Sequence, residues 1–345
     1  MGHLAAWINE KQGLVAPSPA DTPSPGPNEL LIKVNVIGFS PIESKVQKFA
    51  THLIPYPNIL GFSYAGTVES IGPDVPNFKP GDRVASIRTG PRSADPRFGA
   101  YQQYALASAS STARLPQNVP LESAASTIMN LAAVTSALTL FLGLERPIID
   151  GKTAEQRTEK VLIYGGSSSN GGLAVRYARA AGYQVVTTSS PKHREYVESL
   201  DPQVVLDHGK VAVELATDIK ANGPYHQVFD TIGLPPVTDM LVEYFASLGG
   251  GVYHTLIPPL GGEKPIPDSV QRKFAPYSFS LEEPANKELK EWFYDTLVPK
   301  GLESGAIVPT RPQWVEGGLK NVQTALDLMA DGAVSGHKLV MDPWA

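Results

Sequence analysis

The chain has no cysteine among its 345 residues, and this absence excludes several kinds of site at once. Without a thiol there is no disulfide, no iron–sulfur cluster, no cysteine nucleophile and no cysteine-ligated zinc. The seven histidines do not replace these ligands, because they are scattered and show no spacing of the HxxxH type. We therefore predict that the protein holds no metal ion.

The chain also lacks an excess of positive charge, since its formal net charge is −5. A protein of this charge has no broad field for nucleic acid and no polybasic tether for a membrane surface. Residues 124–144 carry no charge, but the Ser, Thr and Asn side chains among them favour a buried helix over a membrane span. Residues 1–13 have no apolar run of the secretory type. We expect a cytoplasmic protein without nucleic-acid or membrane partners.

Two successive patterns of secondary structure divide the chain. Segments at 30–36, 64–71 and 83–87, separated by Pro- and Gly-rich turns, predict strands of a partly open β-barrel. Between residues 161 and 255, strands and helices alternate, which predicts parallel βαβ units in a doubly wound sheet. The strands expected there are 161–164, 183–188, 204–206, 227–230 and 251–255, and the helices are 171–181, 195–200, 211–220 and 237–247. Further helices are expected at 121–144, 287–302 and 319–329, with a final strand at 336–341.

A glycine-rich turn joins the first strand of the alternating part to its first helix. The turn consists of Gly165, Gly166, Ser167, Ser168, Ser169, Asn170 and Gly171. A strand, a glycine turn and a helix N-terminus in this order bring backbone amides close to a pyrophosphate. The spacing departs from strict GxGxxG, and a purely structural turn is the alternative. We interpret the turn as the phosphate-binding loop of a dinucleotide cofactor.

The residues after the second strand of this part select the nucleotide. An NAD site places Asp or Glu about 20 residues past the loop, where it holds the ribose hydroxyls. Here Ser189, Ser190, Lys192 and Arg194 stand at that place. The stretch from the end of the second strand to Arg194 contains no Asp or Glu, and the first acidic residue after it is Glu195. Two hydroxyls and two cations suit a 2′-phosphate, although an ordinary solvated turn has the same composition. The sequence therefore predicts NADPH as the cofactor.

Several motifs together resemble the medium-chain dehydrogenase/reductase superfamily over essentially the whole chain. They are Gly61-Phe62-Ser63-Tyr64-Ala65-Gly66-Thr67-Val68, Phe78-Lys79-Pro80-Gly81-Asp82-Arg83-Val84, the glycine turn, Phe229-Asp230-Thr231-Ile232-Gly233 and Gly336-His337-Lys338-Leu339-Val340. The resemblance implies a Rossmann-type parallel sheet at 126–300 that binds NADPH. It also implies a GroES-like, β-rich catalytic domain made of 1–125 and 301–345. Ile232 and Lys338 belong to these motifs and are expected at the cofactor.

Within the superfamily, the chain is most similar to fungal enoyl reductases that act in trans in polyketide-type pathways. Ser40-Pro41-Ile42-Glu43-Ser44-Lys45 resembles the Asn-Pro-x-Asp-x-Lys stretch of that branch, from which Ser40 and Glu43 depart. Alcohol dehydrogenases of the superfamily place Cys, His and Glu around a catalytic zinc. This chain has Gly61-Phe62-Ser63 where they carry Gly-His-Glu. The resemblance therefore supports a zinc-free reductase.

Without a Lewis acid, hydride transfer to a polarised C=C needs hydrogen-bond donors for the enolate charge. Lys45 is the first candidate, as the lysine of the family-like stretch, and the resemblance places Thr135 beside the nicotinamide. Tyr64 and Tyr253 are candidate donors, and His254 ends a strand where a parallel sheet forms its ligand crevice. Each has a structural alternative: a surface lysine, a helix hydroxyl bonded to a carbonyl, packed tyrosines and a satisfied core histidine.

These features predict an NADPH-dependent ene reductase that transfers a hydride to the Cβ of an α,β-unsaturated thioester or carbonyl in fungal secondary metabolism. Two alternatives fit the same residues, namely quinone or imine reduction on the same scaffold and a non-catalytic NADPH-binding protein. The irregular segment 257–267 predicts an apolar substrate, either free or bound to a carrier protein. The sequence leaves both a monomer and a homodimer open.

Overall fold

The alternating and the β-rich parts of the sequence fold as two units in the computed structural model, which describes residues 2–89 and 94–345. The barrel unit comprises Met1–Met129, Leu281–Glu303 and Pro309–Ala345. The parallel-sheet unit comprises Asn130–Ser280 and Ser304–Val308. The division falls inside the helix α2 (Leu121–Thr135), close to the expected boundary at residue 126.

Residues 281–300 were expected in the parallel-sheet domain, whereas the structure groups them with the barrel unit. The reason is that residues Phe293–Leu297 pack on residues Thr112–Arg114 of the barrel unit. Polar contacts add to this, because Glu282 accepts a hydrogen bond from Ser111 Oγ at 3.1 Å and Lys290 Nζ donates to Ser110 Oγ at 3.2 Å. Composition does not reveal such contacts, because Ser111 and Glu282 are 171 residues apart.

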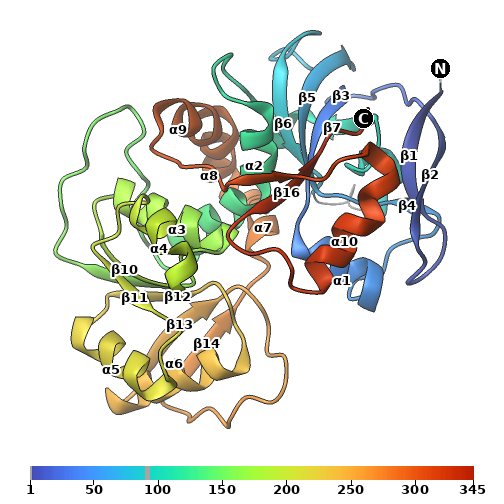
Figure 1. Cartoon of the computed structure of the whole chain (residues 1–345). Helices are drawn as coiled ribbons and strands as arrows, with labels where there is room; N and C mark the ends of the chain where they lie inside the picture. Colours follow the sequence, from blue (N-terminus) through green and yellow to red (C-terminus); the bar gives the residue numbers. More distant parts are fainter. Residues whose placement is uncertain (1, 90–93) are drawn as a thin grey trace. The chain divides into compact units, whose positions relative to one another are not determined.

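The parallel-sheet unit contains a six-stranded sheet with the order β11-β10-β9-β12-β13-β14, and each pair in it is parallel (Figure 1). Its strands are β9 (Lys160–Tyr164), β10 (Gln184–Ser189), β11 (Val204–Asp207), β12 (Gln227–Asp230), β13 (Gly251–Thr255) and β14 (Val270–Phe274). Its helices are α3 (Ser169–Ala180), α4 (Arg194–Glu198), α5 (Ala212–Asn222), α6 (Pro235–Ser247) and α7 (Tyr277–Ser280). The predicted doubly wound sheet is confirmed.

The order of the strands places a ligand crevice in this unit. The chain runs outward from β9 to β10 and β11, and then returns to the other side of β9 for β12. Ligands of such sheets bind at the carboxyl ends of the strands where the direction reverses, which here means β9 and β12. The strands can be apolar on both faces because helices cover them: α3 packs on β9 and β10, and α6 packs on β13 and β14.

The barrel unit contains a seven-stranded sheet and a three-stranded sheet within the described residues. Its strands are β1 (Gly2–Ile8), β2 (Val15–Asp21), β3 (Glu29–Gly38), β4 (Asn58–Ile59), β5 (Ser63–Ile71), β6 (Arg83–Ile87), β7 (Tyr104–Ser108), β8 (Thr112–Arg114), β15 (Pro312–Trp314) and β16 (Lys338–Met341). Its helices are α1 (Pro41–Phe49), α8 (Lys287–Trp292), α9 (Val298–Ser304) and α10 (Val322–Ala330). The predicted β-rich domain is confirmed.

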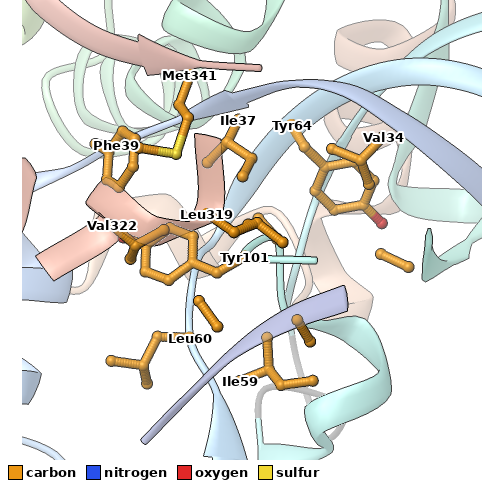
Figure 2. Packing of buried hydrophobic residues seen from close by; sticks show 14 of the residues in the cluster. Val34, Ile37, Phe39, Ile59, Leu60, Tyr64, Tyr101, Leu319, Val322 and Met341 are labelled. Atoms are coloured by element: carbon orange, nitrogen blue, oxygen red, sulfur yellow. The ribbon is translucent and has the colours of Figure 1, made fainter. Parts of the chain in front are cut away.

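Buried apolar side chains hold the barrel unit together (Figure 2). Ile37 of β3, Tyr64 of β5 and Met341 of β16 come from neighbouring strands, and Val322 of α10 joins the same cluster. The seven-stranded sheet curves where β3 and β5 change register, between Leu31 and Ile32 and again between Val34 and Val36. Irregularities of this kind bend a strand and increase its twist.

The strand β2 was not predicted, because its sequence is rich in proline. A central strand forms backbone hydrogen bonds with a neighbouring strand on each side, and Pro17 and Pro19 have no N–H to donate to either neighbour. The structure places β2 at the edge of the three-stranded sheet, with Pro17 opposite Ala6 and Pro19 opposite Leu4. Because the two prolines are two residues apart, their nitrogens point to the same side of the strand. An edge strand has one side without a partner strand, so it can accommodate both prolines there.

The uncharged segment that raised the membrane question is the helix α2 and its continuation. Over Leu121–Phe141 the helix is long and apolar enough to cross a membrane, but 83% of its most apolar window is buried inside the protein. The prediction of a buried core helix is therefore confirmed. The helix becomes π-helical at Ser136–Phe141.

Candidate functional site

The glycine turn connects β9 to α3 by a path that requires its glycines. Gly165 has a φ of +90°, which favours glycine, and a Cβ on it would lie 2.6 Å from Ile232 Cγ1. A Cβ on Gly171 would lie 2.0 Å from the carbonyl oxygen of Gly165. The side chain of Ser168 caps α3 by accepting a hydrogen bond from the N–H of Gly171 at 2.9 Å. The first turn of α3 therefore lies directly against the loop.

Threonines at the end of β10 fix the loop from one side. The N–H of Gly165 donates to Thr188 Oγ1 at 2.9 Å, and the N–H of Gly166 donates to the carbonyl of Thr188 at 2.9 Å. Thr187 Oγ1 donates to the carbonyl of Ile163 at 2.6 Å. The structural role of Thr187 and Thr188 is to hold the glycine loop to the end of β10.

Residues that follow β12 fix the loop from the other side. Thr231 Oγ1 donates to the carbonyl of Tyr164 at 2.7 Å and lies 2.9 Å from Ser168 Oγ. Asp230 accepts hydrogen bonds from the N–H groups of Ile232 and Gly233, at 2.9 and 3.0 Å. Burial raises the pKa of the Asp230 carboxyl, and these hydrogen bonds oppose the rise. The loop that carries Ile232 is thus turned back towards β9.

The residues expected to select the nucleotide lie at the end of β10 and directly after it. Ser189 is buried, with its hydroxyl donating to the carbonyl of Ser190 at 3.0 Å, whereas Lys192 and Arg194 are exposed. Arg194 Nε donates to Glu198 Oε1 at 2.8 Å. In register with Ser189 lies Asp207 of β11, which the sequence reasoning missed; its Oδ1 accepts a hydrogen bond from the N–H of Gly209 at 2.8 Å.

The residues of this edge fit a dinucleotide. Gly165 and Gly171 let the loop fold tightly against α3 and Ile232, because a Cβ on either residue would clash with the protein there. Asn170 Oδ1, in the first turn of α3, is buried and has no hydrogen-bond partner among the described residues. A helix N-terminus and close-packed glycines are the features with which such sheets hold a pyrophosphate.

His254 and Thr135 lie inside the parallel-sheet unit. His254 is buried, its Nδ1 is 3.2 Å from Tyr277 Oη, and burial lowers its pKa to about 4. The imidazole is therefore neutral at pH 7. Thr135 is fully buried, and its hydroxyl has no hydrogen-bond partner among the described residues. It precedes the π-helical segment directly, and π-turns within helices are frequent at functional sites.

A buried carboxylate organises the family-like stretch in the barrel unit. Glu43 of α1 is completely buried and accepts hydrogen bonds from Ser40 N at 2.6 Å, Phe62 N at 2.7 Å and Tyr101 Oη at 2.7 Å. All three partners are donors, so the arrangement needs the ionised carboxylate. Lys338 supplies positive charge nearby, and its Nζ donates to Ser40 Oγ at 3.1 Å. Burial raises the pKa of Glu43 and lowers that of Lys338 to about 8.

The other candidates of the barrel unit differ in their surroundings. Lys45 is half-buried on α1, and no hydrogen bond or ion pair of its ammonium is found among the described residues. Tyr64 is buried in the core, where its hydroxyl donates to the carbonyl of Leu106 at 2.9 Å and burial raises its pKa. Lys338 was expected at the cofactor and is engaged with Ser40 and Glu43 within the barrel unit.

The comparisons with known proteins cover the whole chain. The alcohol dehydrogenase GroES-like domain matches residues 26–117. A trans-enoyl reductase of Aspergillus flavipes is 32% identical over 353 residues, which cover 98% of this chain and 98% of that protein. This chain belongs to the medium-chain dehydrogenase/reductase superfamily. It is accordingly an oxidoreductase, and the fold of the superfamily implies a nicotinamide cofactor.

Solved structures of this superfamily share the fold of the chain. An alcohol dehydrogenase superfamily protein from Novosphingobium aromaticivorans has a TM-score of 0.75 and 22% identity, and 99% of each chain is covered. A mycobacterial protein crystallised with NADPH has a TM-score of 0.76 and 23% identity, covering 99% of this chain and 100% of that one. At identities of 22% and 23%, the similarity to these structures shows a shared fold alone.

The positions of the zinc ligands in related alcohol dehydrogenases carry other chemistry in this superfamily member. Phe62 offers no ligand atom, and its N–H donates to Glu43. Ser63 is buried, and its hydroxyl donates to the carbonyl of Gly38 at 3.1 Å. Among the described residues, no group of three or more His, Asp or Glu side chains is placed to hold a metal ion. The absence of a resident metal stays a prediction.

Proposed function

We propose that the protein is an NADPH-dependent ene reductase of fungal secondary metabolism. The observation that carries the cofactor choice is the end of β10, where Ser189 and Ser190 are followed by the exposed cations Lys192 and Arg194. Support for the reaction class comes from full-length similarity to a trans-enoyl reductase. The substrate that this reading requires is an α,β-unsaturated thioester or carbonyl, free or carried on a carrier protein.

The choice of NADPH rests on charge at one end of the sheet. An NAD site uses a carboxylate at the end of the second strand, and a carboxylate there would repel a 2′-phosphate. In this chain β10 ends in Ser189, and the neighbouring Asp207 is engaged with the N–H of Gly209. Lys192 and Arg194 have exposed ammonium and guanidinium groups, which suit charge-assisted hydrogen bonds to phosphate oxygens.

The reaction needs groups that hold negative charge on the substrate and deliver a proton. NADPH, when bound, supplies the hydride. We assign the stabilisation of the enolate charge to the ammonium of Lys45, for which no hydrogen bond or ion pair is found among the described residues. Tyr64 is not used in this proposal, since its hydroxyl is already engaged with Leu106 in the core.

The experiment compares substrates and two lysines of the same helix. Purified protein is given NADPH under anaerobic conditions with a 2-enoyl thioester, and separately with a quinone. We expect reduction of the enoyl compound. Lys45→Met lowers kcat by at least about tenfold, the scale of one lost stabilising group of 1.4 kcal/mol. Lys48→Met is the matched control, because Lys48 lies on the same helix and pairs with Asp327.

Three results would contradict the proposal. Reduction of quinones alone would favour the quinone reductase. Binding of NADPH without turnover of any substrate would favour a non-catalytic binding protein. Equal kcat values for Lys45→Met and Lys48→Met would remove Lys45 from the mechanism.

A further inference from the structure

A buried arginine contacts both loops that leave the carboxyl edge of the sheet beside the cofactor loop. Arg272 lies on the edge strand β14, and its side chain is only 3% exposed. Its Nη2 donates to the carbonyl of Gly233 at 3.4 Å and to the carbonyl of Ile257 at 3.3 Å. Gly233 follows β12 and Ile257 follows β13. One guanidinium therefore joins two segments that are far apart in sequence.

The same two loops also supply the negative charge around Arg272. Glu263, in the loop after β13, has Oε1 at 4.0 Å from Arg272 Nη1 and accepts a hydrogen bond from the N–H of Leu260. Asp230 is buried at the end of β12, where the charge of Arg272 counteracts the effect of burial on its pKa. Each loop thus offers the guanidinium one carbonyl and one carboxylate.

The packing beneath the guanidinium argues against a role in stability alone. Arg272 Nε and Nη1, Tyr253 Oη and Thr238 Oγ1 are all buried and have no hydrogen-bond partner among the described residues. The two arginine nitrogens can only donate, whereas the two hydroxyls can donate or accept, so the guanidinium keeps donors that no aligned acceptor takes up. A buried cation with unused donors costs free energy, and an apolar residue of similar size often gives a more stable protein. The arginine is better explained by what its two hydrogen bonds position.

The loop after β12 packs directly on the glycine turn, and the loop after β13 packs on the loop after β12. Ile232, next to Gly233, lies so close to Gly165 that a Cβ there would be 2.6 Å from Ile232 Cγ1. The side chain of Ile257 packs on Gly233, where an added Cβ would lie 2.2 Å from Ile257 Cγ1. Displacement of either loop would therefore move the residues that line the cofactor loop, since close-packed interiors transmit strain.

We infer that Arg272 is a positioning residue for the dinucleotide site, acting through the carbonyls of Gly233 and Ile257. The inference rests on the cofactor part of the proposed function. It predicts that removing the guanidinium loosens two loops and weakens the binding of NADPH, while the sheet itself stays folded. Asp230, Glu263 and Arg272 would then act together to hold the two loops in place.

The test uses three variants of the full-length protein. Arg272→Met removes the guanidinium and keeps the length of the side chain, Arg272→Lys keeps the charge without the planar fork, and Lys273→Met is the control. Lys273 is the next residue on β14 and is exposed. We measure the Kd for NADPH by fluorescence, hydrogen exchange of segments 231–234 and 256–260 without cofactor, and the free energy of unfolding.

For Arg272→Met we expect at least tenfold weaker NADPH binding and faster exchange in both segments, with no uniform loss of protection. The Kd of Arg272→Lys for NADPH should lie between those of Arg272→Met and the wild type, and the Kd of Lys273→Met should equal that of the wild type. The inference is overturned if Arg272→Met binds NADPH within twofold of the control, or if binding falls only in step with global stability. If Arg272→Met does not fold, Arg272→Lys decides: wild-type affinity and exchange would refute the inference.

Hydrogen exchange of the two loop segments, measured without cofactor, separates this inference from the proposed function. A wild-type protein that binds NADPH but reduces no enoyl compound contradicts the proposed reaction and leaves the role of Arg272 measurable. A wild-type protein that binds no NADPH contradicts the role of Arg272 at the cofactor together with the proposed cofactor.

Discussion

Gly171→Ala is the substitution whose effect follows most directly from the geometry of the cofactor loop. The added Cβ would lie 2.0 Å from the carbonyl oxygen of Gly165, which is backbone and has no rotamer with which to move away. To restore ordinary contact, α3 or the loop must shift by roughly 1 Å or more. The neighbouring Gly172→Ala provides a matched control, because its Cβ would meet the hydroxyl of Tyr196 at 2.9 Å, the far end of a side chain.

The two substitutions should therefore differ in their effect on stability. Alanine within a helix gains about 1 kcal/mol over glycine, whereas overpacking costs about 1–3 kcal/mol. For Gly171→Ala the cost is at the upper end, since backbone must move, and the expected net loss is about 2 kcal/mol. For Gly172→Ala the two contributions nearly cancel. A shift of the loop away from the pyrophosphate should also weaken NADPH binding by at least about tenfold, or 1.4 kcal/mol.

Urea unfolding and titration with NADPH measure both effects on the same preparations. Gly171→Ala should show a lower free energy of unfolding and a raised Kd, and Gly172→Ala should stay close to wild type in both. If the two variants had the same stability and the same Kd, the close packing of α3 on the loop would not determine cofactor binding.

Three further predictions concern charge. Lys192→Gln with Arg194→Gln should weaken NADPH binding at least about tenfold and leave NADH binding unchanged, by titration at fixed ionic strength; equal losses for both cofactors would refute the assignment. His254 has a pKa of about 4, below its unfolded value near 6.5, so the unfolded chain binds more protons between these pH values. The free energy of unfolding should therefore fall as the pH drops through this window, by about 2 kcal/mol at pH 5, and His254→Asn should remove that loss in pH-dependent unfolding. Glu43→Gln should destabilise the protein by about 3–5 kcal/mol in urea and Tyr101→Phe by about 1 kcal/mol; similar values for both would show that the buried charge is not the central acceptor.

The parallel-sheet unit was predictable because its local signals agree with its fold. The bounds expected for β12 and β13, 227–230 and 251–255, are those of the structure. Buried strands of this type are short apolar runs, and helices follow them at regular intervals. The edge strand β14 (Val270–Phe274) was missed, because it contains Arg272 and Lys273 and follows an irregular proline-rich segment. At the edge of a sheet, polar side chains can face solvent, so the apolar signal is lost.

The site was predictable where it depends on the chain's own sequence neighbours, and not where it depends on distant ones. The glycine turn and the residues after β10 are local, and both lie where the sequence reasoning placed them. Glu43 was seen only as a departure from the family-like stretch, whereas its partners Phe62 and Tyr101 are 19 and 58 residues away. The hydroxyl of Tyr64 is likewise taken by a carbonyl 42 residues distant. Periodicity and spacing carry no information about such pairs.

The central claim is that this protein transfers a hydride from NADPH to an enoyl carbon, and one single-turnover measurement tests it most directly. NADPH deuterated at the transferable position is mixed anaerobically with a 2-enoyl thioester and excess protein, and the product is analysed by mass spectrometry and NMR. The account predicts a saturated thioester with one deuterium on Cβ, and little or no such product with NADH. An unlabelled enoyl thioester recovered unchanged, from a protein that binds NADPH, would contradict it.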